Sequence, residues 1–167
     1  MESSVAFHCP HPRGLAYSRH QNRGSFSGMP NKEDMKKSFC PTVLCIDDDW
    51  DLLKLEKLVL ETAGYAVLLA NDSTQGLNLV KRGTVDLVVL DAEMPRMAGT
   101  ELAERLRTTQ PALPIIMVSG VAVRKRSTKT ADRYIPNAKM VMTLGREVNR
   151  LLDNKRALST PMTLLNE

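Results

Sequence analysis

Short apolar runs alternate along this chain with segments in which apolar residues recur every three or four positions. The runs predict five strands, near residues 42–46, 65–69, 87–91, 114–118 and 140–143. The segments between and after them predict five helices, near residues 50–63, 73–82, from 100 onward, 122–134 and 147–155. Strands that alternate with helices in this way form a parallel sheet with helices on both faces, joined by right-handed crossovers. The expected fold class is therefore α/β.

The first helical segment carries clear signals for its two ends. Asp49 is a suitable N-cap, and Gly64 is placed to stop the helix in the left-handed conformation. Apolar residues recur at helical spacing within it, and we expect them to face the core. These residues are Leu52, Leu55 and Val59, with Leu58 widening the stripe.

Three of the predicted strands end on polar residues. The run at 42–46 is followed by Asp47, Asp48 and Asp49, the run at 87–90 ends on Asp91, and the run at 114–118 is followed by Ser119. If these strands are parallel neighbours, their carboxyl ends meet at one edge of the sheet. Clustered carboxylates repel one another unless a cation lies among them or a proton is shared, and oxygen ligands suit Mg²⁺. The sequence therefore predicts a magnesium-dependent phosphoryl site.

The same residues resemble a known family. An acidic pair, then Asp91 in the pattern D-x-x-M-P-x-M-x-G, then Ser119 followed by a small residue, is similar to the receiver domain of two-component response regulators. The resemblance covers about residues 41–157. It implies a flavodoxin-like (βα)5 doubly wound sheet with strand order 2-1-3-4-5.

The resemblance also implies a role for each site residue. Asp91 is expected to be the phosphoacceptor, receiving the group from a sensor histidine kinase or phosphotransfer protein. Asp48 and Asp91 are expected to ligate Mg²⁺ directly, Asp47 through a metal-bound water, and Glu93 through its backbone carbonyl. Ser119 is expected to bind the phosphoryl group and to move its loop, which signals to a downstream protein at the face of the fourth helix, fifth strand and last helix.

Two positions depart from the family pattern. Receivers usually carry a lysine at the end of strand five and an aromatic residue three positions earlier. Residues 141–148 align best with that segment, which places Leu144 at the lysine position and Val141 at the aromatic position. Lys139 and Arg146 are nearby cations, but neither falls where the family pattern needs one. Leucine offers no charge-assisted hydrogen bond, so we expect the signal to be relayed poorly.

The remaining sequence sets the domain limits. The chain has 167 residues, enough for one domain of ordinary size. Residues 1–40 are basic and lack helical or strand periodicity, so we expect a disordered leader, and residues 158–167 are expected to form a tail. Three irregularly spaced cysteines imply no disulfide framework, and no apolar run approaches the length of a bilayer span. We expect a cytoplasmic protein with no membrane segment and no DNA-binding domain.

A basic run lies within the predicted fourth helix, where the family meets its partners. Its cations are opposed only by Asp132, so it is either a solvated helix face or a surface for an acidic partner. The run consists of Arg124, Lys125, Arg126, Lys129 and Arg133. Homodimerisation is left open by the sequence.

The main reading is a stand-alone receiver that is not an enzyme in its own right. The alternative is a degenerate receiver acting as a phosphorylation-independent adaptor or dimerisation module. Leu144 favours this alternative, and the intact acids argue against it. A magnesium-dependent phosphatase with Asp91 as nucleophile and Glu93 as second acid is a weaker fit, because no cap domain is available. No glycine-rich loop follows a strand, which disfavours a nucleotide-binding enzyme.

Overall fold

The computed structural model of the chain describes residues 40–95, 97–120 and 130–159. The predicted disordered leader up to residue 39, most of the basic run and the end of the predicted tail lie outside these residues. Within the described ranges, no helix has both the length and the apolar character needed to cross a bilayer.

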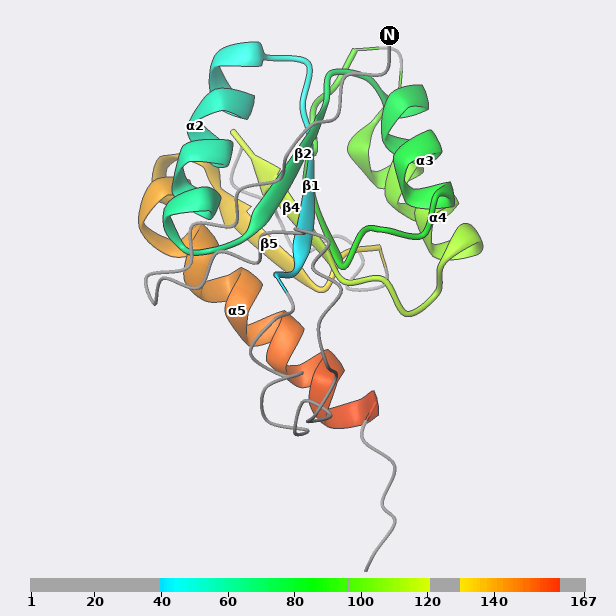
Figure 1. Cartoon of the computed structure of the whole chain (residues 1–167). Coiled ribbons are helices and arrows are strands. Elements are labelled where there is room, and N and C mark those ends of the chain that lie inside the picture. Colours follow the sequence, from blue (N-terminus) through cyan, green and yellow to red (C-terminus); the bar gives the residue numbers. More distant parts are fainter. Residues whose placement is uncertain (1–39, 96, 121–129, 160–167) are drawn as a thin grey trace, which may run out of the picture.

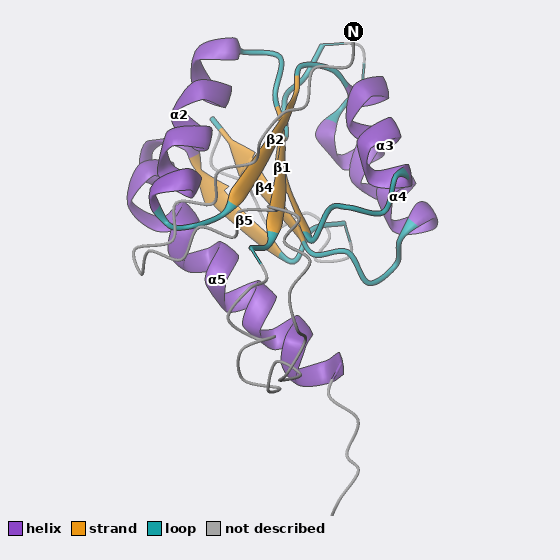
Figure 2. Ribbon diagram, viewed as in Figure 1, coloured by secondary structure: helices purple, strands orange, loops and turns teal. Residues whose placement is uncertain are grey.

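The centre of the fold is a five-stranded sheet in which all neighbouring strands are parallel (Figure 2). Its order is β2-β1-β3-β4-β5, so the expected flavodoxin-like order is confirmed. The two strands that end on acids, β1 and β3, are therefore direct neighbours. The strands are β1 (Thr42–Ile46), β2 (Ala66–Ala70), β3 (Leu87–Asp91), β4 (Ile115–Ser119) and β5 (Arg133–Pro136).

Helices cover both faces of the sheet (Figure 1). On one face α2 (Trp50–Thr62) packs beside α5 (Met140–Ser159), and on the other α3 (Ser73–Lys81) packs beside α4 (Gly99–Thr109). Alternate residues of each strand serve the two cores, because successive strand side chains point to opposite faces. In β1, Leu44 and Ile46 join the α3–α4 core, while Val43 and Cys45 join the α2–α5 core.

The prediction of strand five at residues 140–143 is wrong. The fifth strand is β5, which begins seven residues before the predicted strand and pairs with β4. A 3₁₀ turn over Asn137–Lys139 links β5 to α5. Residues 140–143 form the first turn of α5, whose buried positions recur every four residues. These buried residues are Met140, Leu144, Val148 and Leu152. The predicted helix at 122–134 is wrong at its end, because residues 133 and 134 belong to β5; its first eight residues lie outside the described ranges.

The predicted buried face of the first helix is wrong in part. In α2 the buried residues are Leu53, Glu56 and Leu60. Of the predicted residues, Leu55 and Leu58 are exposed, whereas Leu52 and Val59 are half-buried and Val59 packs against the core. The buried residues of α2 have i, i+3, i+7 spacing, but the middle one is a glutamate. A pattern of hydrophobic residues alone therefore does not reveal this face. The predicted N-cap is confirmed: the side chain of Asp49 accepts hydrogen bonds from the amides of the first turn.

Candidate functional site

Three carboxylates converge where β1 and β3 end. Ile46 pairs with Leu90 in the sheet, so the residues that follow them, Asp47 and Asp91, emerge side by side. One oxygen from each of Asp47, Asp48 and Asp91 lies within 4.8 Å of the others. Asp47 and Asp91 are 4% and 9% exposed, whereas Asp48 is open to solvent. The acidic cluster expected from the strand ends is therefore present in the structure.

Backbone amides hold the two buried carboxylates in place. Asp47 Oδ1 accepts a hydrogen bond of 2.8 Å from the amide of Asp49, and Asp91 Oδ2 accepts one of 2.9 Å from the amide of Glu93. Each bond spans two residues, so it closes the turn that carries the acid away from its strand. One oxygen of each group is thereby fixed by the backbone.

The loop after Asp91 is closed by a close approach between two backbone segments. The amide of Gly99 donates a 3.1 Å hydrogen bond to the carbonyl of Ala92. A Cβ on Gly99 would lie 2.1 Å from the carbonyl oxygen of Asp91, so only glycine fits. Met94 is buried against the α3–α4 core, which anchors the middle of the loop. The motif residues around Asp91 therefore fix the shape of the acceptor loop.

The described residues bring little positive charge to the site. Burial raises the pKa of Asp47 to about 6, assisted by the charges of Asp91, Asp48 and Asp49 and opposed by the Asp49 amide. Burial likewise raises the pKa of Asp91, against the backbone amides of Glu93 and Ala92. Within the described ranges, no lysine or arginine forms an ion pair with these acids. A cluster of this kind either holds protons or binds a cation.

The donor set fits a hard divalent cation. All the converging ligands are carboxylate oxygens, two of them buried and one open to solvent, which leaves room for water ligands. Mg²⁺ is typically bound by one or two carboxylates together with waters and phosphate oxygens. The residues present therefore suit Mg²⁺ better than a softer metal.

The far side of the site is formed by the ends of β4 and β5. Ser119 is buried at the end of β4 and pairs with Pro136, the last residue of β5. The residue after β5 is Asn137, whose Nδ2 lies 3.7 Å from the point where a Cβ on Gly120 would stand. A carboxylate oxygen of Glu93 lies 3.8 Å from the same point. Asn137 and Glu93 therefore both reach the loop that follows Ser119.

Leu144 does not lie at the end of a strand. It is fully buried in α5, among residues of the α2–α5 core, and Val141 lies on the same helix with its side chain exposed. The alignment that placed the lysine and aromatic positions on these two residues depended on the wrong fifth strand. In the structure, the residue that follows strand five is Asn137, and Tyr134 lies three positions before it.

Sequence reasoning missed Glu56, which lies beneath the site. Its side chain is 2% exposed and its Oε2 has no hydrogen-bond partner among the described residues. Burial raises the pKa of Glu56 to about 8, and the charges of Asp47 and Asp91 add to the shift, while a hydrogen bond with Cys45 opposes it. The signal that could have found it is its position between Leu53 and Leu60 on a helical stripe.

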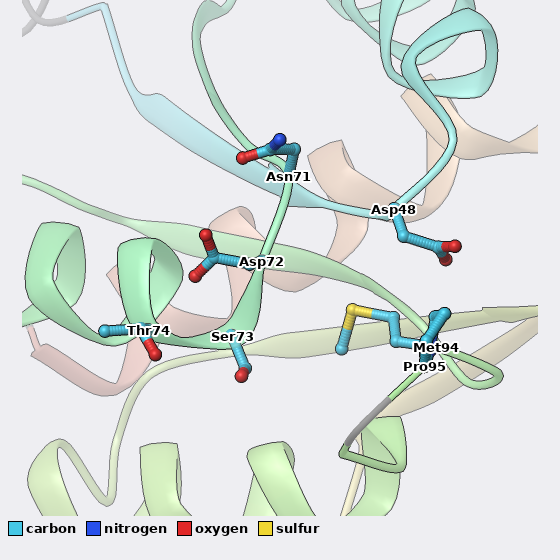
Figure 3. Close-up of a pocket in the computed structure, with 7 residues that line it drawn as sticks. All are labelled: Asp48, Asn71, Asp72, Ser73, Thr74, Met94 and Pro95. Atoms are coloured by element: carbon cyan, nitrogen blue, oxygen red, sulfur yellow. The ribbon is translucent and has the colours of Figure 1, made fainter.

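A hollow of about 450 Å³ opens beside Asp48 (Figure 3). Residues 71–74, at the start of α3, line one side, and Met94 and Pro95 line the other. Its walls carry hydroxyl, amide and carboxylate groups, and none of the described residues that line it is cationic. The hollow gives solvent and ligands a route to the exposed carboxylate of the cluster.

The sequence is similar to a known protein family and to several of its members. A family model described as the response regulator receiver domain matches residues 43–142. Response regulator MprA of Mycobacterium leprae is 34% identical over 114 residues, covering 66% of this chain and 50% of that protein. The transcriptional regulatory protein GlrR of Escherichia coli is 39% identical over 77 residues, covering 46% of this chain and 17% of that protein. The chain thus spans half or less of these curated relatives.

Solved structures of receiver domains have a similar fold over most of the described chain. A CheY-like receiver domain protein from Methanospirillum hungatei is 30% identical, with a TM-score of 0.68, covering 72% of this chain and 100% of that one. The response regulator protein TrrA of Thermotoga maritima, solved in complex with Mg²⁺ and BeF, is 28% identical with a TM-score of 0.62, covering 66% of this chain and 98% of that one.

Proposed function

Because the chain belongs to the response regulator receiver domain family, we propose that Asp91 accepts a phosphoryl group from a histidine kinase or a phosphotransfer protein. The observation that carries this proposal is the setting of Asp91. It is a nearly buried acid at the end of the central strand β3, oriented by the Glu93 amide, with two more carboxylates within 4.8 Å. Asp91 is the buried member that lies on the acceptor loop closed by Gly99.

The proposed step is a transfer between two nucleophiles. A carboxylate oxygen of Asp91 forms a bond to phosphorus while the bond from phosphorus to the donor's histidine nitrogen breaks, and the released imidazole takes up a proton. The transition state is loose, so the protein contributes chiefly position and charge balance. Bound Mg²⁺ would supply the positive charge that neutralises the phosphoryl oxygens.

The neighbouring residues have separate proposed roles. Asp48 would hold the cation directly, Asp47 through water, and the Glu93 carbonyl would complete the protein ligands. Ser119, buried at the end of β4, would donate its hydroxyl to the phosphoryl group. Movement of the Ser119 loop would then reach β5 and the start of α5, where Met142 presents an exposed apolar side chain to a partner or to a second copy.

The experiment is phosphorylation with acetyl phosphate in Mg²⁺, read by intact mass. We expect the wild-type chain to gain the mass of one phosphoryl group and Asp91→Asn to gain none. Asp49→Asn is the matched control, since it removes a neighbouring exposed acid while asparagine still caps α2. Equal labelling of wild type and Asp91→Asn would contradict the proposal. Absence of labelling in the wild type would also contradict it and would favour a phosphorylation-independent adaptor.

A further inference from the structure

The end of β5 contributes a neutral side chain to the site. Asp91 pairs with Val118 and Ser119 pairs with Pro136, so Asn137 follows β5 at the same edge of the sheet that carries the acids. Its side chain is half-buried, and its amide nitrogen reaches Gly120 beside the Glu93 carboxylate. Asn137 is thus placed on the side of the site that faces Ser119.

The described residues supply no cation at this place. The next lysine, Lys139, is exposed, and its backbone carbonyl accepts a hydrogen bond from Thr143 at the start of α5. The arginine of β5, Arg133, is at the other end of that strand and pairs with Glu147. Among the described residues, the end of β5 therefore brings an amide, and not a cation, to the edge of the sheet that carries the acids.

We propose that Asn137 contacts the phosphoryl group as a neutral hydrogen-bond donor, and that its neutrality leaves a bound divalent cation to provide the positive charge of the site. This inference rests on the proposed function of Asp91. An amide donates one weak hydrogen bond where an ammonium would donate a charge-assisted one. No fixed positive charge of the described residues therefore competes with the cation, and the site depends on that cation to hold the phosphoryl group.

Replacing Asn137 by lysine tests the charge directly. As a general Coulomb estimate, an ammonium and a divalent cation separated by about 7 Å in a solvent-like dielectric repel each other enough to weaken cation binding roughly five- to tenfold. The matched control is Ala138→Lys, which adds the same charge at the exposed neighbouring position. In about 0.15 M salt we expect that control to change the affinity less than about twofold, because screening acts strongly on exposed charges.

The chain carries its own reporter for the titration. Trp50 is its single tryptophan and lies two residues after Asp48, at the start of α2, half exposed. Mg²⁺ is titrated into wild type, Asn137→Lys, Asn137→Ala and Ala138→Lys while the fluorescence of Trp50 is followed. At saturating Mg²⁺ the same proteins are titrated with beryllofluoride. Thermal melts confirm that each variant is folded.

The inference predicts opposite responses to the two ligands. Asn137→Lys should bind Mg²⁺ more weakly and beryllofluoride more tightly than wild type, and Asn137→Ala should keep its Mg²⁺ affinity but lose about two- to tenfold in beryllofluoride affinity. Equal Mg²⁺ affinities in Asn137→Lys and Ala138→Lys, or an unchanged beryllofluoride affinity in Asn137→Ala, would overturn it. If wild type binds Mg²⁺ but no beryllofluoride, the proposed function and the phosphoryl contact both fail. In that case the Mg²⁺ affinities of Asn137→Lys and Ala138→Lys still show whether a charge at position 137 affects cation binding.

Discussion

The buried glutamate of α2 makes the stability of this domain depend on pH. Glu56 faces the sheet between Leu53 and Leu60, beside the thiol of Cys45, and its Oε2 is unpaired among the described residues. Its pKa rises from 4.5 to about 8 on folding, chiefly because burial penalises the charged form. The folded state therefore holds a proton that the unfolded chain has released between these two values.

The sign and size of the effect follow from proton linkage. Since the folded state binds more protons, Glu56 favours folding least at high pH: its contribution to stability is complete below pH 4.5 and is lost as the pH rises toward 8. Each unit of pKa difference corresponds to about 1.4 kcal/mol, so the full loss is about 3–5 kcal/mol. That is a large part of the stability of a typical domain.

The perturbation is Glu56→Gln, which keeps the shape of the side chain and removes its titration. Urea unfolding is measured from pH 5 to 8.5 with a chelator present, so that no metal occupies the site. We expect the two proteins to have similar stability near pH 5 and the variant to be more stable by about 3 kcal/mol or more near pH 8. Subtracting the two curves removes the contribution of Asp47, whose raised pKa acts in the same direction.

The control is Glu61→Gln, which removes a half-exposed glutamate from the same helix, where it pairs with Lys57. Its curve should run parallel to wild type within about 0.5 kcal/mol, because exposed pairs contribute little. Parallel curves for Glu56→Gln and wild type would refute the reasoning, since they would mean that Glu56 is solvated or paired in the folded protein.

Three further predictions test the site and the core. Leu144→Lys should lower the free energy of unfolding by at least about 3 kcal/mol in urea denaturation, because the position is fully buried, and should not improve phosphorylation. Gly99→Ala should destabilise the fold through its clash with the Asp91 carbonyl, whereas Gly145→Ala, whose Cβ would meet Ala63 at 3.4 Å, should stabilise it by up to about 1 kcal/mol in the same assay. Mg²⁺ affinity, measured by calorimetry, should fall as the pH drops from 7 to 5, because protonation of Asp47 with a pKa of about 6 competes with the cation.

The fold and the acidic cluster follow from sequence because the signals for them are local and uninterrupted. The apolar runs that form β1, β3 and β4 are buried along their whole length, so each stands out in the sequence. Their polar ends then follow from the rule that carboxyl ends of parallel strands share an edge. The positions of Asp47, Asp91 and Ser119 at that edge needed no further information.

The fifth strand could not be found this way because it lies at the edge of the sheet. In β5 Ile135 is buried, while its neighbours are wholly or partly exposed, so no apolar run marks the strand. The apolar residues at 140–144 match a strand equally well until the whole of α5 is read with a period of four. That one error moved the expected lysine position from the end of the sheet into the core at Leu144.

The raised pKa values of the site have a common origin. Burial is the largest cause for Asp47, Asp91 and Glu56, and the negative charge of other acids adds to each shift. A divalent cation among Asp47, Asp48 and Asp91 would cancel that added repulsion and would displace the protons that otherwise relieve it. Its effect would also extend to Glu56, whose pKa is raised by the charges of Asp47 and Asp91. Cation binding would thereby be linked to the protonation of Glu56, the glutamate of α2 that the hydrophobic pattern concealed.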